Sequence, residues 1–314
     1  MNTQPMNASL YDLSQNTQGQ LFMAMQKKFS ETLEPLPPIL QVRRGYAESP
    51  AWFMVQASEF APEPLTVHNI RVRDIYASKR LVAALLEMLA GERWLARVGD
   101  AYHLTPLGKT LIGQLQERTA KVLTSTQLSI SDVLVEGVEA SLRQIIDASL
   151  TQLDATITWC LRYSRNRAPD DSAHPFLKLS QYFSDFNAYR DDAHMKAWQA
   201  HEPEGFIWES FAQIATQKAH DVASVFDLLY YRGYAKEEFQ NGVDQLVEKE
   251  WLMSDENGRL TVTEMGQAVF EAVEKTTDEL FYAPWRTFST EFQDKTIQQL
   301  QQFHDELQAI ASEE

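Results

Sequence analysis

A single cysteine, Cys160, stands in the 314-residue sequence, so the chain cannot form an internal disulfide and suits a reducing compartment such as the cytoplasm. Glycine is also scarce, at 12 residues, and no phosphate-cradling glycine loop, G-x-S-x-G or H-E-x-x-H motif is present. The motif inventory therefore ranks an enzyme low and predicts no cofactor. No stretch approaches the roughly 20 apolar residues of a membrane span, and residues 1–20 lack the basic start and apolar run of a signal peptide.

Positive charge is the second scarcity. The chain has 28 lysine and arginine residues against 44 aspartate and glutamate residues, a formal net charge of −16. An acidic protein is repelled by nucleic-acid phosphates, so the location of the charge matters. Residues 66–122 contain 9 basic and 5 acidic residues, a net charge of +4, whereas residues 224–280 contain 5 and 13, a net charge of −8. Only the first window has a charge suited to DNA.

The two windows belong to an internal repeat. The stretch from Tyr76 to Gly108 recurs from Tyr234 to Gly266, with Trp94 repeated at Trp251. Each copy begins with a helical pattern, in which the apolar residues Leu81, Leu85, Met88 and Leu89 of the first copy are matched by Phe239, Val243, Leu246 and Val247 of the second. The repeat offset is about half the chain, which indicates one structural unit written twice.

Each copy continues with the pattern of a short hairpin and a capped helix. Tight turns are predicted at Gly99-Asp100 and at Asn257-Gly258, between two short strands in each copy. Thr105 and Thr263 then stand where the N-cap of a following helix belongs, and Pro106 suits the first helical position. Helix, two-stranded wing and capped helix predict a winged helix-turn-helix unit at about residues 65–122 and another at about 221–280.

The second copy resembles a known family. The run E-K-E-W-L … N-G-R-L-T-V-T-E-M-G-Q-A-V-F-E-A-V is similar to the wing and following helix of MarR (multiple antibiotic resistance regulator) proteins, and F-S-T-E-F-Q-D-K-T-I-Q-Q-L-Q-Q-F to their last, dimerisation helix. The first half carries a similar ending, L-S-I-S-D-V-L-V-E-G-V-E-A-S-L. A MarR-like subunit has roughly half this length and works as a dimer. The resemblance therefore implies a tandem, pseudo-dimeric chain with an internal pseudo-twofold and long dimerisation-type helices.

These patterns set the expected domain boundaries. Residues 1–150 form the first MarR-like half and residues 151–314 the second, with an aromatic helical insertion at residues 174–203. The first 18 residues are polar and are predicted to be a flexible tail.

Candidate DNA-binding residues gather in the first copy. The helix from Ser78 would be the recognition helix, whose first turn points at base edges, and its lysine, arginine and hydroxyl groups suit phosphate and guanine contacts. The predicted set is Thr66, Arg71, Arg73, Ser78, Lys79, Arg80, Arg97 and His103. The alternative is an ordinary solvated helix surface. In the second copy the same turn holds Glu237 and Glu238, which suit a helix N-terminus but repel phosphate.

Other candidate sites are less specific. Trp52, Trp198 and Trp208 either fill the core or line the place where MarR-like proteins hold small aromatic effectors; the second use is implied by the resemblance alone. His194 and His201 lie two helical turns apart, too far to share one metal ion, so no metal site is predicted.

Two hypotheses follow, with a third of lower rank. The first is a cytoplasmic transcriptional regulator that binds double-stranded DNA through the first winged helix and responds to a small effector. If only that copy binds, one chain covers one half-site, and two-site binding requires a homodimer. The second is a winged-helix protein-interaction or ligand-sensing module that has lost DNA binding, which the net charge favours. The third is an enzyme that uses the aromatic insertion as its pocket.

Overall fold

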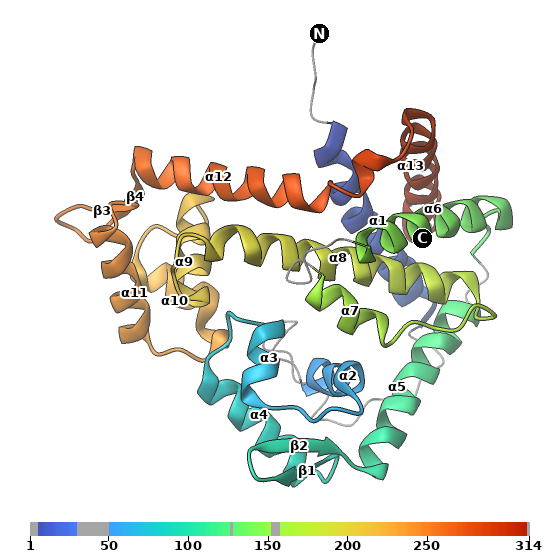
Figure 1. The fold of residues 1–314 in the computed structure, drawn as a ribbon, viewed down its shortest axis with the longest axis horizontal. Coiled ribbons are helices and arrows are strands. Elements are labelled where there is room, and N and C mark those ends of the chain that lie inside the picture. The colour runs from blue at the N-terminus through green and yellow to red at the C-terminus, as the bar shows by residue number, and fades with distance from the viewer. Residues whose placement is uncertain (1–5, 30–49, 126–127, 152–157, 313–314) are drawn as a thin grey trace. The chain divides into compact units, whose positions relative to one another are not determined.

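The computed structural model describes residues 6–29, 50–125, 128–151 and 158–312, and its elements are labelled in Figure 1. The described chain consists mainly of α-helices, with two small antiparallel sheets of two strands each. This confirms the prediction of a mostly α fold with short β-strands. The chain separates into two compact units.

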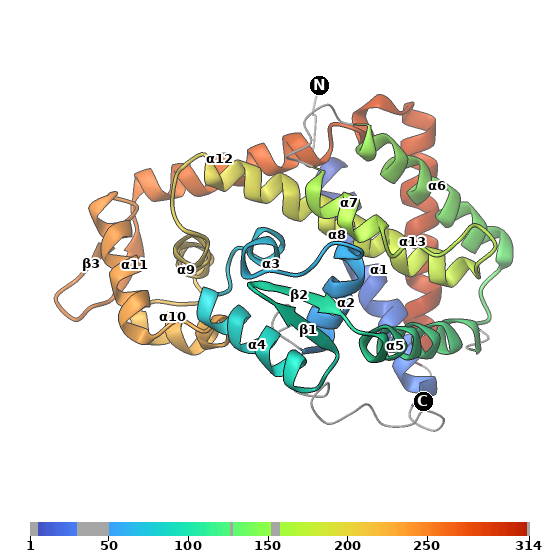
Figure 2. The ribbon, with the colours of Figure 1, turned by 60° about the horizontal axis from the view of Figure 1, so that its bottom comes forward.

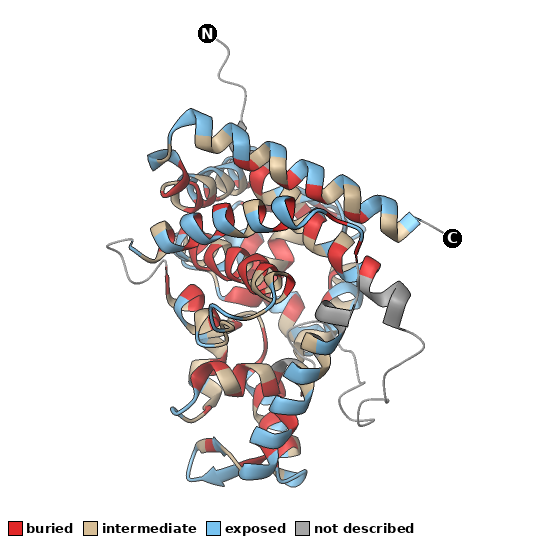
Figure 3. Cartoon of the chain, turned by 90° about the vertical axis from the view of Figure 1, so that its right-hand side faces the viewer, coloured by how far each residue is buried: buried red, intermediate tan, exposed pale blue. Residues whose placement is uncertain are grey.

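The first unit takes the described parts of Met1–Pro35, Gly113–Ala193 and Thr277–Glu314. Its helices are α1 (Met6–Phe29), α6 (Asp132–Leu150), α7 (Trp159–Arg165) and α13 (Thr290–Ser312), with most of α8 (Pro175–Gln199) and parts of α5 (Pro106–Ser125) and α12 (Glu264–Phe281). The buried residues of α13 recur every three or four positions along one side of the helix (Figure 3), at Thr296, Leu300, Phe303 and Leu307. This period is that of a single helix face, and the stripe packs into one shared apolar core.

Helix α1 corrects the expected flexible tail, because the chain is helical from Met6. Among the described side chains of this helix, the buried ones are Leu10, Ser14, Thr17, Leu21 and Ala24, so two of the five are polar. The Ser14 hydroxyl donates to the Tyr11 carbonyl at 2.8 Å and that of Thr17 to the Leu13 carbonyl at 2.6 Å. Satisfied in this way, small hydroxyl residues can be buried, and they hide the helical period from a hydropathy pattern.

The second unit takes the described parts of Leu36–Ile112 and His194–Thr276, and the same order of elements occurs in it twice. The first series is α2 (Pro50–Phe60), α3 (Val67–Arg73), α4 (Lys79–Gly91), β1 (Leu95–Val98), β2 (Ala101–Leu104) and the start of α5 (Pro106–Ser125). The second is α9 (Gly205–Ala215), α10 (Val222–Leu229), the 3₁₀ turn η3 (Tyr230–Arg232), α11 (Lys236–Glu248), β3 (Leu252–Ser254), β4 (Leu260–Val262) and the start of α12 (Glu264–Phe281). Each series is a helix-turn-helix followed by a two-stranded wing.

Both hairpins form where the turn residues predict them (Figure 2). In the first, Val98 pairs with Ala101, and Gly99 in the turn has a φ of 63°. In the second, Ser254 pairs with Leu260, and the turn contains Gly258 at φ 76°. Left-handed backbone at these positions favours glycine, which explains its use in both turns.

Threonine caps the helix after each hairpin, as predicted. The Thr105 hydroxyl oxygen accepts the Gly108 amide of α5 at 3.0 Å, and that of Thr263 accepts the Gly266 amide of α12 at the same distance. Pro106 is the first residue of α5. The caps satisfy amides that a helix N-terminus otherwise leaves without a partner.

The repeated glycines have a steric reason. A Cβ atom added to Gly108 would lie 2.2 Å from the Trp94 carbonyl oxygen, and one added to Gly266 would lie 2.1 Å from that of Trp251. Only a residue without a side chain lets the helix approach the base of the hairpin this closely. The repeated tryptophan, threonine and glycine therefore describe one local packing arrangement, present in both winged helices.

Each compact unit draws on residues from both halves of the chain. The predicted halves, 1–150 and 151–314, concern how the sequence is repeated and stay a prediction. The aromatic segment predicted at residues 174–203 is largely the single helix α8.

Candidate nucleic-acid interface

The two helix-turn-helix turns touch each other inside the second unit. The first turn, residues 74–78, joins α3 to α4, and the second, residues 230–235, joins α10 to α11. The Ser78 amide donates to the Arg232 carbonyl at 2.9 Å, and the Ser78 hydroxyl donates to the Gly233 carbonyl at 3.0 Å. We call the contacts between these two segments, with the first turns of α4 and α11, the turn contact.

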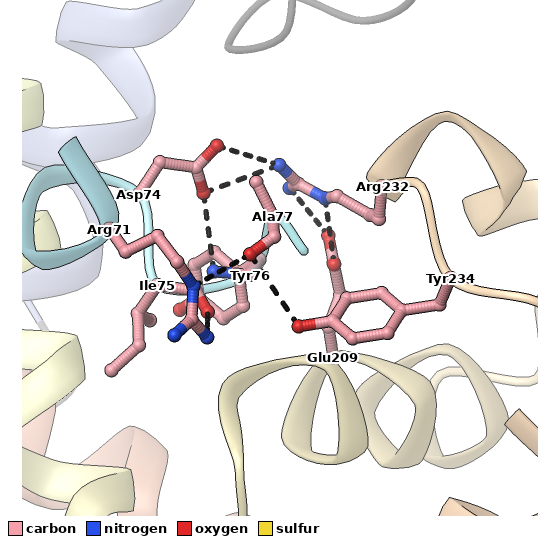
Figure 4. A network of polar contacts seen from close by, with 8 residues as sticks. All are labelled: Arg71, Asp74, Ile75, Tyr76, Ala77, Glu209, Arg232 and Tyr234. Atoms are coloured by element: carbon pink, nitrogen blue, oxygen red, sulfur yellow. Dashed lines mark hydrogen bonds and ion pairs between the residues drawn. The ribbon is translucent and has the colours of Figure 1, made fainter. Parts of the chain in front are cut away.

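Arg232 links the two turns through its guanidinium (Figure 4). It lies 3.2 Å from the Asp74 carboxylate of the first turn and 2.7 Å from that of Glu209 on α9. All three side chains are at most 15% exposed, so the charges are largely removed from water. Burial raises the pKa of the Glu209 carboxyl, and the neighbouring Arg232 guanidinium acts in the opposite direction. Such a bridge is specific to these side chains, because each buried charge requires an opposite charge beside it.

Glycine allows the close approach at the turn contact. Gly233 has a φ of 77°, and a Cβ atom there would lie 2.6 Å from Cβ of Leu81 and 2.8 Å from the Ser78 hydroxyl. Both the backbone conformation and the lack of space therefore favour glycine at this position.

Thr66 and two predicted arginines serve the first winged helix itself. Thr66 is the N-cap of α3, where its hydroxyl accepts the Asn69 amide at 3.0 Å. Arg71 Nε donates to the Ala77 carbonyl at 2.9 Å, and Arg73 Nε lies 3.9 Å from the Glu59 carboxylate. The Arg73 and Glu59 side chains are 13% and 0% exposed. These groups therefore hold the helix-turn-helix together, and their contact with DNA stays a prediction.

At the first turn of α4, some side chains are bonded within the chain and one is not engaged by the second winged helix. Ser78 is the N-cap, accepts the Leu81 amide at 3.2 Å and is only 3% exposed. Arg80 donates from Nε to the Gly233 carbonyl at 2.7 Å and forms an ion pair with Glu238. Lys79, by contrast, is exposed. Of the three residues predicted to face base edges, two are thus engaged by the second winged helix.

Glu238 has two roles at the start of α11. Its carboxylate accepts the Ala235 amide at 2.6 Å and also the Arg80 guanidinium. Partial burial alone would raise the pKa of this carboxyl, but these two hydrogen bonds outweigh that effect and lower it. The acidic turn of the second copy therefore caps its own helix and neutralises a cation of the first copy.

The predicted wing residues lie on the hairpin and face solvent. Arg97 on β1 is 51% exposed, donates to the Gly99 carbonyl at 2.8 Å and forms an ion pair with Glu87 of α4. His103 on β2 is exposed and pairs in register with Ala96. Exposed ion pairs contribute little stability, so Arg97 can exchange Glu87 for another anion.

The tryptophans proposed for an effector are buried. Trp198 and Trp208 are each 1% exposed and stack at 6.2 Å between ring centroids. The indole N–H groups donate to the Tyr76 hydroxyl and to His194 Nε2, each at 3.2 Å. Both rings belong to the core of the second unit, and effector binding by them stays a prediction. The side chain of Trp52 lies outside the described residues.

A cavity of about 720 Å³ on α13 was not anticipated from the sequence. It lies within the first unit and is lined by Trp285, Gln293, Asp294, Ile297, Gln298, Gln301, Gln302, Asp305, Glu306 and Ala309. Glutamines and carboxylates on the outer face of a helix are typical of solvated surface, so no sequence signal distinguishes this cavity. Within the described ranges, no three His, Cys, Asp or Glu side chains are grouped to hold a metal ion.

The turn contact was also missed, because Asp74, Glu209 and Gly233 follow no known motif. One signal was available: Arg80 and Glu238 are separated by 158 residues, the repeat offset, and carry opposite charge. Corresponding segments of two repeated units can meet each other, so opposite charges at that offset favour a contact between them.

Comparison with known proteins gives one match. The model of a helix-turn-helix family matches residues 163–312, which include α8 to α13 and the second winged helix. No curated protein and no solved structure matches the chain. None of the described helices is both long enough and apolar enough to span a bilayer. The chain thus carries a helix-turn-helix domain of the DNA-binding kind over residues 163–312.

Proposed function

We propose that this protein is a DNA-binding transcriptional regulator of the MarR-like type, with two winged helices fused in one chain. The observation that carries the proposal is the pair of complete winged helices in the second unit, one of which lies in a segment of net charge +4. Winged helices also serve purely structural purposes, so the cationic surface is what favours DNA over other roles.

The duplication is supported by local geometry. The same order of elements, the same threonine caps and the same glycine contacts occur in both copies. The turn contact adds a second argument. Two identical copies meeting through this turn would bring Lys79 and Arg80 near their own equivalents, which is repulsive. Once the copies are fused they can diverge, and Glu238 in one then neutralises Arg80 in the other.

DNA would be met by the exposed cations of the first winged helix. Lys79 at the start of α4 and Arg97 and His103 on the hairpin are exposed, and they suit phosphate or minor-groove contact. The proposed surface also includes groups that hold its shape and groups that become available when the turn contact is absent. These are Thr66, Arg71, Arg73, Ser78 and Arg80.

The turn contact limits how many half-sites one chain can read. Recognition helices on successive half-sites lie roughly 34 Å apart. The first turns of α4 and α11 instead share hydrogen bonds and an ion pair. In this arrangement one chain covers one half-site, and two-site binding requires a homodimer.

A small aromatic effector remains part of the proposal. Trp198 and Trp208 are fully enclosed, so an effector would reach them only if the core of the second unit opened. Binding of that kind would shift the conformational equilibrium toward an open state. The size of the shift is set by the difference in effector affinity between the open and the closed states.

A protein-interaction or ligand-sensing role without DNA binding is the second candidate. The net charge of −16 and the engagement of Ser78 and Arg80 within the chain both favour it. Under this alternative the turn contact is permanent and the first winged helix is a structural module.

A matched pair of variants separates the candidates. Lys79 is the first residue of α4 and Lys236 the first residue of α11, and both are exposed. Fluorescence anisotropy with a pool of mixed-sequence duplexes measures affinity between about 50 and 200 mM salt. The regulator predicts binding that weakens steeply with salt, falls on Lys79→Glu and is little changed by Lys236→Glu. Equal loss in both variants contradicts it, and so does a lack of binding at low salt that persists in the Arg232→Ala variant, which breaks the turn contact.

A further inference from the structure

Two of the three residues that α4 would present to a major groove, Ser78 and Arg80, are already bonded inside the chain. The Ser78 amide and hydroxyl are used by the carbonyls of Arg232 and Gly233, and Arg80 Nε is used by the Gly233 carbonyl. A recognition helix contacts bases through its N-terminal residues. The Ser78 amide and hydroxyl and Arg80 Nε cannot bond to DNA while they are bonded to residues 232–233.

The Glu238 carboxylate occupies the position of an anion on Arg80. A carboxylate and a DNA phosphate offer the same acceptor chemistry to a guanidinium, and charge-assisted pairs of this kind are stronger than neutral hydrogen bonds. Arg80 is 57% exposed and Glu238 39% exposed, so the pair is open to competition from solvent. A phosphate that approached Arg80 would compete with Glu238 directly.

We propose that the turn contact is an autoinhibitory lock, in which residues 230–238 of the second winged helix mask the DNA-reading turn of the first and must be released before α4 can enter a major groove. This inference rests on the proposed function and deepens it. Arg232 is the latch, because its guanidinium bridges Asp74 of the first turn to Glu209 of the second winged helix. Glu238 is the substitute for phosphate.

The first test compares neighbouring carboxylates of α11. Glu238→Gln removes the charge that holds Arg80, and the glutamine oxygen can still accept the Ala235 amide and keep the cap. Glu237→Gln removes the same charge one residue away, from an exposed side chain. Both variants gain affinity for mixed-sequence duplex from their lower negative charge. The lock predicts that Glu238→Gln gains at least about fivefold more than Glu237→Gln, the lower end of usual coupling between sites.

The second test measures opening without DNA. Arg232→Ala leaves Asp74 and Glu209 without their shared cation, whereas Arg259→Ala removes an equal charge from the exposed hairpin of the same winged helix. Hydrogen exchange of the full chain follows the Ser78 amide, which donates to Arg232. We expect exchange at Ser78 to rise at least tenfold in Arg232→Ala, which corresponds to a fall of about 1.4 kcal/mol in the free energy of opening. Exchange at Ser78 should stay unchanged in Arg259→Ala.

The outcomes distinguish the lock from the proposed function. If duplex DNA binds while the Ser78 amide keeps its full protection in the complex, the protein is a DNA-binding regulator and the lock is wrong. Equal gains from Glu238→Gln and Glu237→Gln also overturn the lock. Unchanged exchange in Arg232→Ala shows that Arg232 is no latch. If Arg232→Ala exposes Ser78 and still binds no DNA, the proposed function fails and the lock fails with it.

Discussion

Arg80 at the start of α4 and Glu238 at the start of α11 form an ion pair, although 158 residues separate them in the chain. The two residues lie in corresponding turns of the two winged helices. The two winged helices thus share an order of elements but carry opposite charge where their turns meet. The acidic copy supplies an anion at the place where the basic copy presents a cation, and the turns can then meet without repulsion.

The glycine that packs against the base of each hairpin should not tolerate a larger residue without a loss of stability. Gly108→Ala places a Cβ atom 2.2 Å from the Trp94 carbonyl oxygen, and Gly266→Ala places one 2.1 Å from that of Trp251. Backbone must shift in each case, so we expect a loss of about 1–3 kcal/mol in the free energy of unfolding. Urea denaturation followed by circular dichroism measures it.

Gly113 in the same helix, α5, provides the control. It is exposed, and a Cβ atom there would meet nothing within 4 Å. Gly113→Ala should therefore stabilise the protein by about 0.5–1 kcal/mol through helix propensity. Equal effects of the Gly108 and Gly113 substitutions would show that the hairpin does not press on α5.

The N-caps of α3 and α10 should differ in pH dependence. Asp221 accepts the Ser224 amide at 2.7 Å, and Thr66 accepts the Asn69 amide at 3.0 Å, in the same capping geometry. The hydrogen bonds from Ser224 lower the pKa of Asp221 below its usual 3.8. Its contribution is therefore present above the unfolded-state pKa and is lost as pH falls through the lower folded-state pKa.

The corresponding measurement is thermal unfolding at pH 7 and near pH 3. Asp221→Ala should cost about 1 kcal/mol at neutral pH and progressively less in acid, whereas Thr66→Ala should cost a similar amount at both pH values. A pH-independent loss for Asp221→Ala would mean that its charge does not contribute to the cap.

Asp192 should protect the single cysteine. Its buried carboxylate accepts the backbone amides of Cys160 at 2.8 Å and of Leu161 at 3.0 Å, at the start of α7. Asp192→Ala leaves both amides without this partner, which should cost about 1–3 kcal/mol. Cys160 is fully buried, so its reaction with a thiol reagent requires local opening. We expect the substitution to accelerate labelling of the thiol.

The adjacent Asp191 is exposed and serves as the comparison. Asp191→Ala should leave the labelling rate of Cys160 close to that of the unchanged protein. Similar acceleration in both variants would indicate a general loss of stability in the first unit instead of a lost cap.

Local signals in the sequence predicted the local structure well. Turn glycines, the threonine caps and the apolar helix spacing each depend on neighbours within a few residues, and hairpins and helices form where these signals place them. The helix at Ser14 and Thr17 was missed because hydroxyls bonded to their own helix replace apolar residues on its buried side.

The candidate site was harder to predict, because it depends on long-range contacts. Arg71, Arg73 and Arg80 were selected for their charge alone, and their partners are Ala77, Glu59 and Glu238, which include residues far away in the chain. A cation bonded to its own protein and a cation open to DNA look the same in a sequence. Lys79, Arg80 and the hairpin residues Arg97 and His103 retain the exposure that the prediction assumed, but Arg80 is bonded to the second winged helix.

The turn contact joins two segments of one polypeptide, and this has a consequence for dilution. Contacts between separate subunits dissociate as protein becomes scarce, whereas tethered partners keep a fixed effective concentration. The balance between engaged and released turns is then the same at low copy number as at high copy number. A change in expression level cannot alter it, but ions, ligands or a competing polyanion can.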